Sequence, residues 1–153
     1  MKRMRWTALL GCLLLAIGAW AADTAEQDIR TTILKSVEGW STLNPDVNDA
    51  YYTSSDSAVF FDIAPMQYAG WQSYKEGAKK MFAGFKDLKL ALNDDLAVHR
   101  AGKFAWATAT WKGDAHLKDG KELHLEGRAT LVLEKQKGKW IIFHEHYSVP
   151  APM

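Results

Sequence analysis

Apolar residues recur at helical spacing, three or four positions apart, in two stretches of the chain. The first stretch covers residues 23–43 and the second covers residues 71–85. The recurring apolar positions are Ile29, Ile33, Val37 and Trp40 in the first stretch, and Tyr74, Ala78, Met81 and Phe85 in the second. Such spacing gathers apolar side chains along one side of a helix, so each stretch predicts an amphipathic helix with one buried face.

The segment between these helices carries turn signals and one short apolar run. Asn44-Pro45-Asp46 interrupts the helical spacing, and Asp46 is placed to cap a short second helix that leads to Tyr51-Tyr52. Residues 58–63 are apolar except for Asp62. This run predicts a short strand that ends at the aspartate.

From residue 87 onward the apolar spacing changes to two, which is the period of a strand with one buried face. Asp119-Gly120 is a hairpin turn signal between two such stretches. The predicted strands cover residues 88–98, with a perturbation at Asn93-Asp94-Asp95, and then residues 104–112, 123–134 and 140–149. Helices first and an antiparallel meander last predict an α+β domain, with the helices on one face of a curved sheet.

The first 22 residues differ from the rest of the chain and predict a secretory signal peptide. Three of the first five residues are basic, residues 6–20 form an apolar run, and small residues follow. This order is typical of a signal peptide, and the run is shorter than the roughly 20 apolar residues that a membrane span needs. We therefore expect residues 1–22 to be removed and residues 23–153 to form one domain, in the periplasm or outside the cell. A lipidated Cys12 and a retained anchor remain as alternatives.

Charge and cysteine content narrow the function classes. The full chain has a formal net charge of +1, and loss of Lys2, Arg3 and Arg5 with the signal peptide leaves −2. A surface so close to neutral argues against nucleic-acid binding. Cys12 is the only cysteine, so the mature domain has no disulfide and depends on its own apolar core. The chain has neither a phosphate-binding glycine loop nor a nucleophile elbow, and we expect no cofactor.

The order of these elements and several short motifs resemble the nuclear transport factor 2-like superfamily. The motifs are Tyr51-Tyr52, Ala58-Val59-Phe60-Phe61-Asp62, Ala69-Gly70-Trp71, Gly127-Arg128-Ala129-Thr130, Gly138-Lys139-Trp140, and the ending His144-Glu145-His146-Tyr147-Ser148-Val149-Pro150. Together they are most similar to the SnoaL-like, ketosteroid-isomerase-like branch, over nearly all of residues 23–153. The ending also resembles the association domain of calcium/calmodulin-dependent kinases.

The resemblance implies a cone-shaped roll, of the nuclear transport factor 2-like or cystatin-like kind. In such a roll a curved antiparallel sheet wraps on the N-terminal helices and leaves one pocket at its open end. The resemblance also implies a homodimer formed through the sheet faces. The superfamily includes isomerases, cyclases, dehydratases, binding proteins and assembly domains, so the fold alone does not give the activity.

Asp62 is the candidate catalytic residue. It follows two aromatic residues at the end of the short predicted strand, where ketosteroid isomerases carry their catalytic aspartate. A carboxylate among aromatic side chains loses solvation, which raises its pKa toward the range of a useful general base. The structural alternative is that Asp62 caps the following turn or pairs with a lysine.

The rest of the isomerase pattern is incomplete in this chain. That chemistry also needs an oxyanion hole, made by a tyrosine and a protonated carboxylic acid. The position of the second acid falls near Ala129 or Leu131, and the position of the tyrosine falls near Glu38 or Trp40. We therefore do not expect steroid isomerisation.

His144 and His146 share one face of a strand and are able to begin a metal site only if a third ligand lies nearby. The resemblance to the kinase association domain places Tyr147 and Glu145 toward the pocket instead, with both histidines on the outer, dimer-forming side. We expect structural histidines and no metal, although a one-residue slip in register exchanges the two faces. Arg128 is either a clamp for a substrate carboxylate or part of an ion pair between strands or subunits.

Aromatic side chains are expected to wall the pocket. The candidates are Trp40, Tyr51, Phe61, Trp71 and Trp106, together with Tyr147 and Glu145 from the last strand. The sequence favours an exported protein that binds a small apolar or amphipathic molecule. If it is an enzyme, we expect cofactor-independent isomerase, cyclase or lyase chemistry with Asp62 as the base. The alternative is a non-catalytic dimeric assembly or accessory module with a vestigial pocket.

Overall fold

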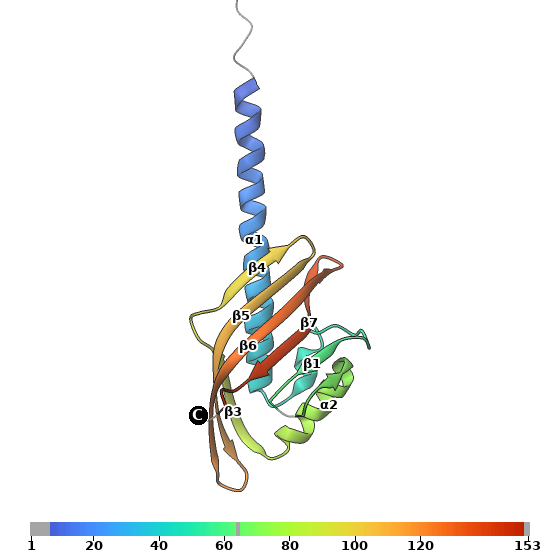
Figure 1. Ribbon diagram of the computed structural model, residues 1–153, viewed down its shortest axis with the longest axis vertical. Helices are drawn as coiled ribbons and strands as arrows, with labels where there is room; N and C mark the ends of the chain where they lie inside the picture. Colours follow the sequence, from blue (N-terminus) through green and yellow to red (C-terminus); the bar gives the residue numbers. More distant parts are fainter. Residues whose placement is uncertain (1–6, 64, 152–153) are drawn as a thin grey trace, which may run out of the picture.

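The computed structural model describes the backbone of residues 7–63 and 65–151, and the side chains within these ranges from residue 24 onward. The described part of the chain forms two helices, a short 3-10 helix and seven strands, of which the last five follow one another (Figure 1). The elements are α1 (Thr7–Ser41), η1 (Pro45–Asn48), β1 (Val59–Phe61), β2 (Tyr68–Ala69), α2 (Gly70–Phe82), β3 (Phe85–Leu92), β4 (Ala97–Ala101), β5 (Phe104–Leu117), β6 (Glu122–Gln136) and β7 (Lys139–Ser148). The predicted α+β class is confirmed.

The strands form one curved sheet in the order β2-β1-β7-β6-β5-β3, with β4 also paired to β5. Neighbouring strands are antiparallel except β1 and β7, which run parallel with Phe60 opposite Glu145. The sheet is therefore mixed, where the sequence predicted a purely antiparallel one. Figure 1 shows the broad β5–β6–β7 part of the sheet lying across α1, with α2 near the end where β1 and β3 are found.

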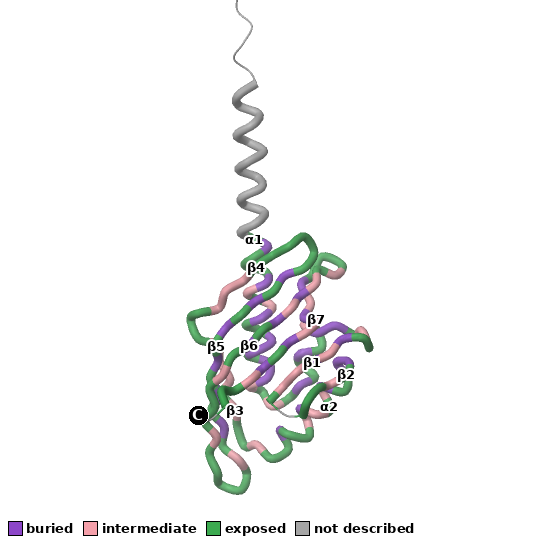
Figure 2. Tube along the Cα trace, viewed as in Figure 1, coloured by how far each residue is buried: buried purple, intermediate pink, exposed green. Residues whose placement is uncertain are grey.

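Strand alternation decides which face of the sheet meets the helices. Along β5, buried and exposed residues alternate, and Figure 2 shows this as a change of colour at each step. Ala105 and Ala107 point inward and are 1% and 0% exposed, so small side chains fill these buried positions of β5. Ile29 and Ile33 on the facing side of α1 are fully buried, as their helical spacing predicts.

Several element boundaries differ from the sequence predictions. Helix α2 ends at Phe82, and Phe85 begins β3 instead of closing the helix. The buried face of α2 consequently includes Phe82, whereas Met81, predicted to be on that face, is 44% exposed. The short second helix is a 3-10 turn that Asn44 caps, because the Asn44 side chain accepts a hydrogen bond from the backbone N–H of Asp46 at 3.2 Å.

The predicted signal peptide, residues 1–22, lies outside the residues whose side chains are described. Within the described part of the chain, no helix is both long enough and apolar enough to cross a bilayer. Removal of these residues and export stay predictions.

Candidate functional site

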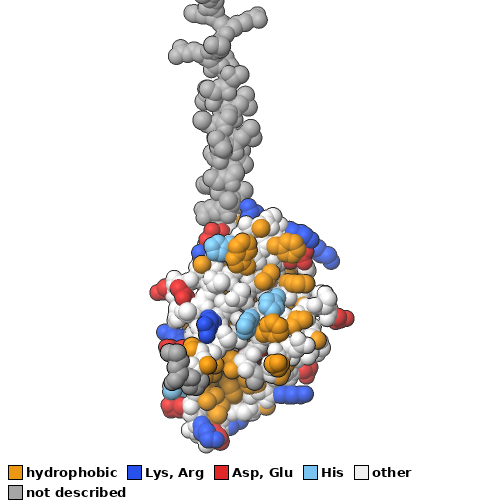
Figure 3. Space-filling model, viewed as in Figure 1, with side chains coloured by type: hydrophobic (Ala, Val, Ile, Leu, Met, Phe, Trp, Pro, Cys, Tyr) orange, Lys and Arg blue, Asp and Glu red, His pale blue; other side chains and the backbone are white. Residues whose placement is uncertain are grey.

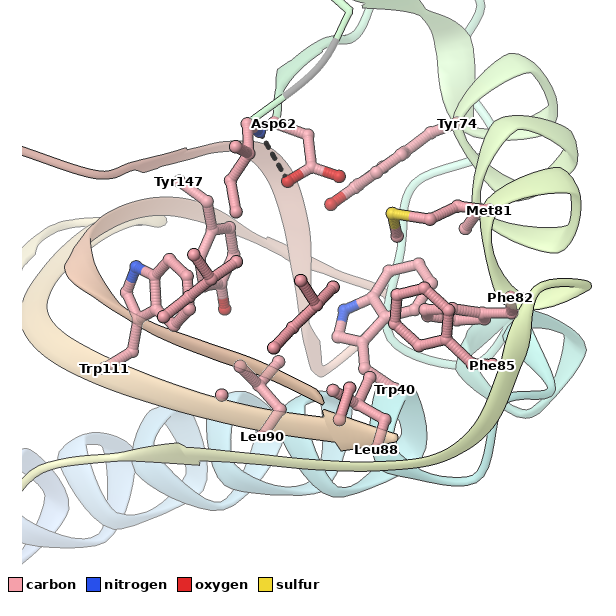
Figure 4. Close-up of a pocket in the computed structure, with 16 residues that line it drawn as sticks. Trp40, Asp62, Tyr74, Met81, Phe82, Phe85, Leu88, Leu90, Trp111 and Tyr147 are labelled. Atoms are coloured by element: carbon pink, nitrogen blue, oxygen red, sulfur yellow. Dashed lines mark hydrogen bonds between the residues drawn. The ribbon is translucent and has the colours of Figure 1, made fainter. Parts of the chain in front are cut away.

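A cavity of about 110 Å³ opens between α2 and the inner face of the sheet (Figure 4). Its wall on the α2 and β3 side is apolar and consists of Ala78, Met81, Phe82, Phe85, Leu88 and Leu90. Trp40 from α1 and Tyr74 from α2 add aromatic surface. The remaining lining comes from Asp62 and Ile63, just after β1, and from the β5–β6–β7 part of the sheet.

Small residues in the sheet leave room for the cavity. Gly113 and Ala115 are inward positions of β5, and both line the space. Gly127 on β6 acts indirectly, since a Cβ atom there would meet the Trp111 ring at 2.8 Å and the carbonyl oxygen of Ser148. The glycine therefore lets the Trp111 ring lie against β6, where it forms part of the cavity wall.

Asp62, just after β1, is the only residue with a charged side chain among those that line the cavity. Its Oδ1 atom accepts a hydrogen bond from the backbone N–H of Ile63 at 2.7 Å. Burial raises the pKa of Asp62 above its ordinary value, and the Ile63 hydrogen bond opposes this only in part. Among the described residues no basic side chain forms an ion pair with Asp62, so the carboxylate is available to a bound molecule.

A second carboxyl group, Glu145 on β7, lies fully buried behind the cavity wall. The Tyr52 hydroxyl donates to its Oε2 atom at 2.6 Å, and the Tyr74 hydroxyl donates to its Oε1 atom at 2.7 Å. Trp40 donates from Nε1 to the Tyr52 hydroxyl at 3.0 Å, which extends the network to the cavity lining. Burial raises the pKa of Glu145 to about 7, although the two tyrosine hydroxyls lower it and the charge of Asp62 adds to the rise.

Tyr74 connects the two carboxyl groups. Its ring lines the cavity from α2, and its hydroxyl donates a hydrogen bond to Glu145. Figure 4 shows the Asp62 carboxylate and the Tyr74 hydroxyl pointing toward one another. The negative charge of Asp62 contributes to raising the pKa of Tyr74, after burial and the charge of Glu145. Asp62, Tyr74 and Glu145 therefore form one electrostatically coupled group at the cavity wall.

Three of the residues predicted from sequence come together at this cavity: Trp40, Asp62 and Tyr147. Glu145 is inward, as expected from the resemblance, but contacts Tyr52 and Tyr74 behind the lining. Trp71 is buried next to this network, where it stacks on Tyr52 with ring centroids 4.1 Å apart. Its Nε1 donates to Asp49 at 2.7 Å, so Trp71 has a structural role.

Three other predicted pocket residues do not reach the cavity. Tyr51 lies in a separate surface groove beside Trp140. Phe61 faces the opposite side of β1 from Phe60 and lies in a shallow surface hollow with His146. Trp106 is 45% exposed on the outer face of the sheet, because the inward positions of β5 are taken by its neighbours in the alternation.

The polar residues predicted at the interface lie on the outer side of the sheet. His144 donates from Nδ1 to the backbone carbonyl of Val59 at 2.6 Å, and His146 is exposed. Arg128 is exposed on β6, opposite Thr110 on β5, and it therefore does not line the cavity. In the described part of the chain, no group of three His, Cys, Asp or Glu side chains is arranged to hold a metal ion.

The strand register shows what occupies the positions at which the isomerase pattern has its second carboxylic acid. Ala129 and Leu131 are inward and buried, as the comparison with isomerases supposed, but neither is polar. Their cross-strand partners on β7 are Tyr147 and Glu145. Glu145 and Tyr147 therefore come from β7, the strand next to β6, on which the resemblance to isomerases places the second acid.

Sequence reasoning missed Tyr52 and Tyr74 as site residues. Tyr74 was visible only as one member of the apolar stripe of α2, and Tyr52 only as an aromatic residue after the break. The expected inward position of Glu145 was a usable signal for these tyrosines. A buried carboxyl group needs hydrogen-bond donors, and tyrosine supplies one without adding charge.

Comparison with known proteins agrees with this geometry. A nuclear transport factor 2-like superfamily protein from Salmonella enterica subsp. enterica serovar Typhimurium str. LT2 is 26% identical, with a TM-score of 0.79 over 86% of this chain and 95% of that one. An NTF2-like protein of unknown function from Pseudomonas putida KT2440 is 27% identical, with a TM-score of 0.70 over 86% and 90%. A protein of the NTF2-like family from Streptomyces avermitilis, proposed to be a dehydratase, shares the fold with 15% identity and a TM-score of 0.74 over 85% and 99%.

No protein of curated function matches the sequence significantly. The SnoaL-like domain family, however, matches residues 29–152, which include η1, α2 and all seven strands. The matched residues therefore include the curved sheet and the cavity against α2 that Asp62 lines. This chain belongs to the SnoaL-like domain family.

Proposed function

We propose that this chain binds one small, largely apolar molecule in the cavity, with Asp62 as the polar anchor. The observation that carries the proposal is a cavity of about 110 Å³ whose apolar wall holds a single charged side chain. An apolar cavity of about 150 Å³ is enough for benzene. The enclosed part of the ligand is therefore about the size of one ring, and a larger ligand would extend out through the opening.

Asp62 also suits cofactor-independent isomerase or lyase chemistry, which is the second candidate function. Its raised pKa and its place at the cavity wall favour proton abstraction from a bound molecule. The fold relative proposed to be a dehydratase is compatible with this chemistry but is too distant in sequence to support it further.

We further propose export of the mature domain and a homodimer formed through the outer face of the sheet. Figure 3 shows hydrophobic and histidine side chains gathered on the face that β5, β6 and β7 present to the viewer. Phe104 and Trp106 are 44% and 45% exposed on β5. A second copy of this face would cover them, as the family resemblance implies.

Native mass spectrometry of the protein, purified gently without organic solvent, tests the binding function. We expect a discrete small-molecule adduct that denaturing extraction releases. The control is Ala115→Leu, which adds bulk at an inward position of the cavity wall and should remove the adduct without unfolding the protein. An empty protein would favour the assembly or accessory role, and a monomer would contradict the proposed dimer.

Deuterium exchange tests the catalytic candidate separately. A ketone of one-ring size is incubated with the protein in D₂O, and NMR follows exchange of the hydrogens next to its carbonyl. A base at Asp62 should accelerate this exchange, and Asp62→Asn should abolish the acceleration. Equal rates for the two proteins would leave binding as the function.

A further inference from the structure

Tyr147 on β7 has a buried hydroxyl group that no group in the described part of the chain binds. The residue is 6% exposed and lines the cavity. Among the described residues, its hydroxyl oxygen has no hydrogen-bond partner. Most buried side-chain polar atoms in folded proteins have a partner, so an unpartnered hydroxyl at a cavity wall points to a ligand.

The surroundings of Tyr147 explain why the protein itself does not supply the partner. The residue paired with it across the sheet is Ala129, which has no polar side-chain atom. Its ring meets Trp111 in a T-shaped contact, with centroids 5.7 Å apart. Both carboxylate oxygens of Glu145, two residues earlier, already accept hydrogen bonds from other tyrosines.

The position of the hydroxyl separates it from the other polar groups of the cavity. Figure 4 shows the Asp62 carboxylate beside Tyr74, whereas the Tyr147 hydroxyl lies apart from both, among Trp111 and Leu90. Trp111 also lacks a partner at Nε1, but that atom lies on the side of the indole away from the other labelled side chains. Among the described residues that line the cavity, Tyr147 is therefore the unpartnered donor that lies with the other lining side chains.

We infer that the Tyr147 hydroxyl forms the second polar subsite of the cavity and donates a hydrogen bond to an uncharged carbonyl-type oxygen of the ligand. This inference rests on the proposed binding function and adds to it the class of ligand. The ligand is a compact, uncharged and largely apolar molecule with one acceptor oxygen at Tyr147.

Charge excludes the anionic form of such a ligand. The side chains that line the cavity include Asp62 but no lysine, arginine or histidine. Glu145 adds a second carboxyl group immediately behind the wall. A carboxylate ligand would therefore be buried near like charges without a cation to balance it. Burial and the nearby carboxyl groups also raise the pKa of Tyr147 well above its ordinary value, so its hydroxyl keeps the proton that it donates.

Tyr147→Phe is an informative variant because it removes the hydroxyl and keeps the ring. Since no described residue bonds to this hydroxyl, the variant should fold with unchanged or higher thermal stability. The matched control is Tyr51→Phe, which makes the same change at a half-buried tyrosine in a separate surface groove.

The binding test uses three one-ring probes and protein NMR titrations. Cyclohexanone and methylenecyclohexane have nearly the same shape but differ in the acceptor oxygen, and cyclohexanecarboxylate carries the charge. We expect the unmodified protein to bind the first two and not the third. Tyr147→Phe should weaken cyclohexanone binding about threefold to tenfold, the range of one net hydrogen bond, and leave methylenecyclohexane binding unchanged or tighter. Tyr51→Phe should change neither.

The outcomes separate this inference from the function on which it rests. If both uncharged probes bind but Tyr147→Phe weakens them equally or not at all, the Tyr147 subsite is wrong and apolar binding stands. Tight binding of cyclohexanecarboxylate would overturn the assigned ligand class. Unfolding of Tyr147→Phe would give the hydroxyl a structural role and overturn the inference. Absence of binding by any probe would overturn both proposals.

Discussion

Replacing Glu145 by glutamine tests the buried carboxyl group at the centre of the network. Glu145 is 0% exposed and accepts hydrogen bonds from Tyr52 and Tyr74 on its two oxygens. Glutamine has nearly the same shape and retains one carbonyl acceptor, while its amide nitrogen is able to donate to the other tyrosine oxygen. The substitution Glu145→Gln therefore removes the ionisable group with little change in packing.

The pKa of Glu145 gives the size and sign of the expected effect. Burial raises it from 4.5 to about 7 in the folded protein. Between these two pH values the folded state holds a proton that the unfolded state has lost, so the free energy of unfolding falls as the pH rises. Each pKa unit corresponds to about 1.4 kcal/mol, which makes the total loss about 3 kcal/mol by pH 8.

Urea denaturation of both proteins at several pH values between 5 and 8 measures this effect. The difference between the two free energies of unfolding isolates position 145, because the other titrating groups are present in both proteins. We expect Glu145→Gln to gain about 2.5 kcal/mol relative to the unmodified protein from pH 5 to pH 8, because part of the total loss has already occurred at pH 5. Parallel pH profiles would refute the reasoning, since they would mean that the two tyrosine hydroxyls compensate fully for burial of the charge.

Three further substitutions have definite expected outcomes. Trp140 is 4% exposed. Trp140→Ala should lower the free energy of unfolding in urea by about 3–5 kcal/mol, because truncation of a buried tryptophan leaves a cavity. A loss below about 1 kcal/mol would contradict the place of Trp140 in the core. Gly127→Ala should destabilise by about 1–3 kcal/mol and alter the near-ultraviolet circular dichroism, because its Cβ would overlap the Trp111 ring; an unchanged protein would mean that the ring shifts freely. Asp62→Asn should leave the free energy of unfolding at pH 5 nearly unchanged. It should also lower the pKa of Glu145, and with it the pH at which the Glu145-dependent stability is lost, because one neighbouring negative charge is removed. An unfolded Asp62→Asn variant would instead assign Asp62 to the turn.

Trp106 and Phe143 show how well alternation along a strand predicts which side chains face inward. The small residues at positions 105 and 107 are the inward ones, so Trp106 faces outward even though a pocket role was predicted for it. Alternation from Tyr147 and Glu145 also points Phe143 inward, but the pairing between β6 and β7 shifts register between Val132 and Leu133. Trp140 and Ile142 are therefore the buried residues before the shift. A bulge of this kind depends on how two strands fit together, and neither strand shows it alone.

The sequence by itself determined the class of the fold, the order of its elements and the position of Asp62 at the end of a short strand, because these follow from local periodicity and turn residues. The resemblance carried by its short motifs also indicated the family. Only the tertiary structure decided the polar make-up of the site. Tyr52 and Tyr74 reach Glu145 across 93 and 71 positions of the chain, and strand register puts Tyr147 opposite Ala129. Hydrogen bonding to a buried carboxyl group depends on distances between separate elements, and no local pattern encodes those distances.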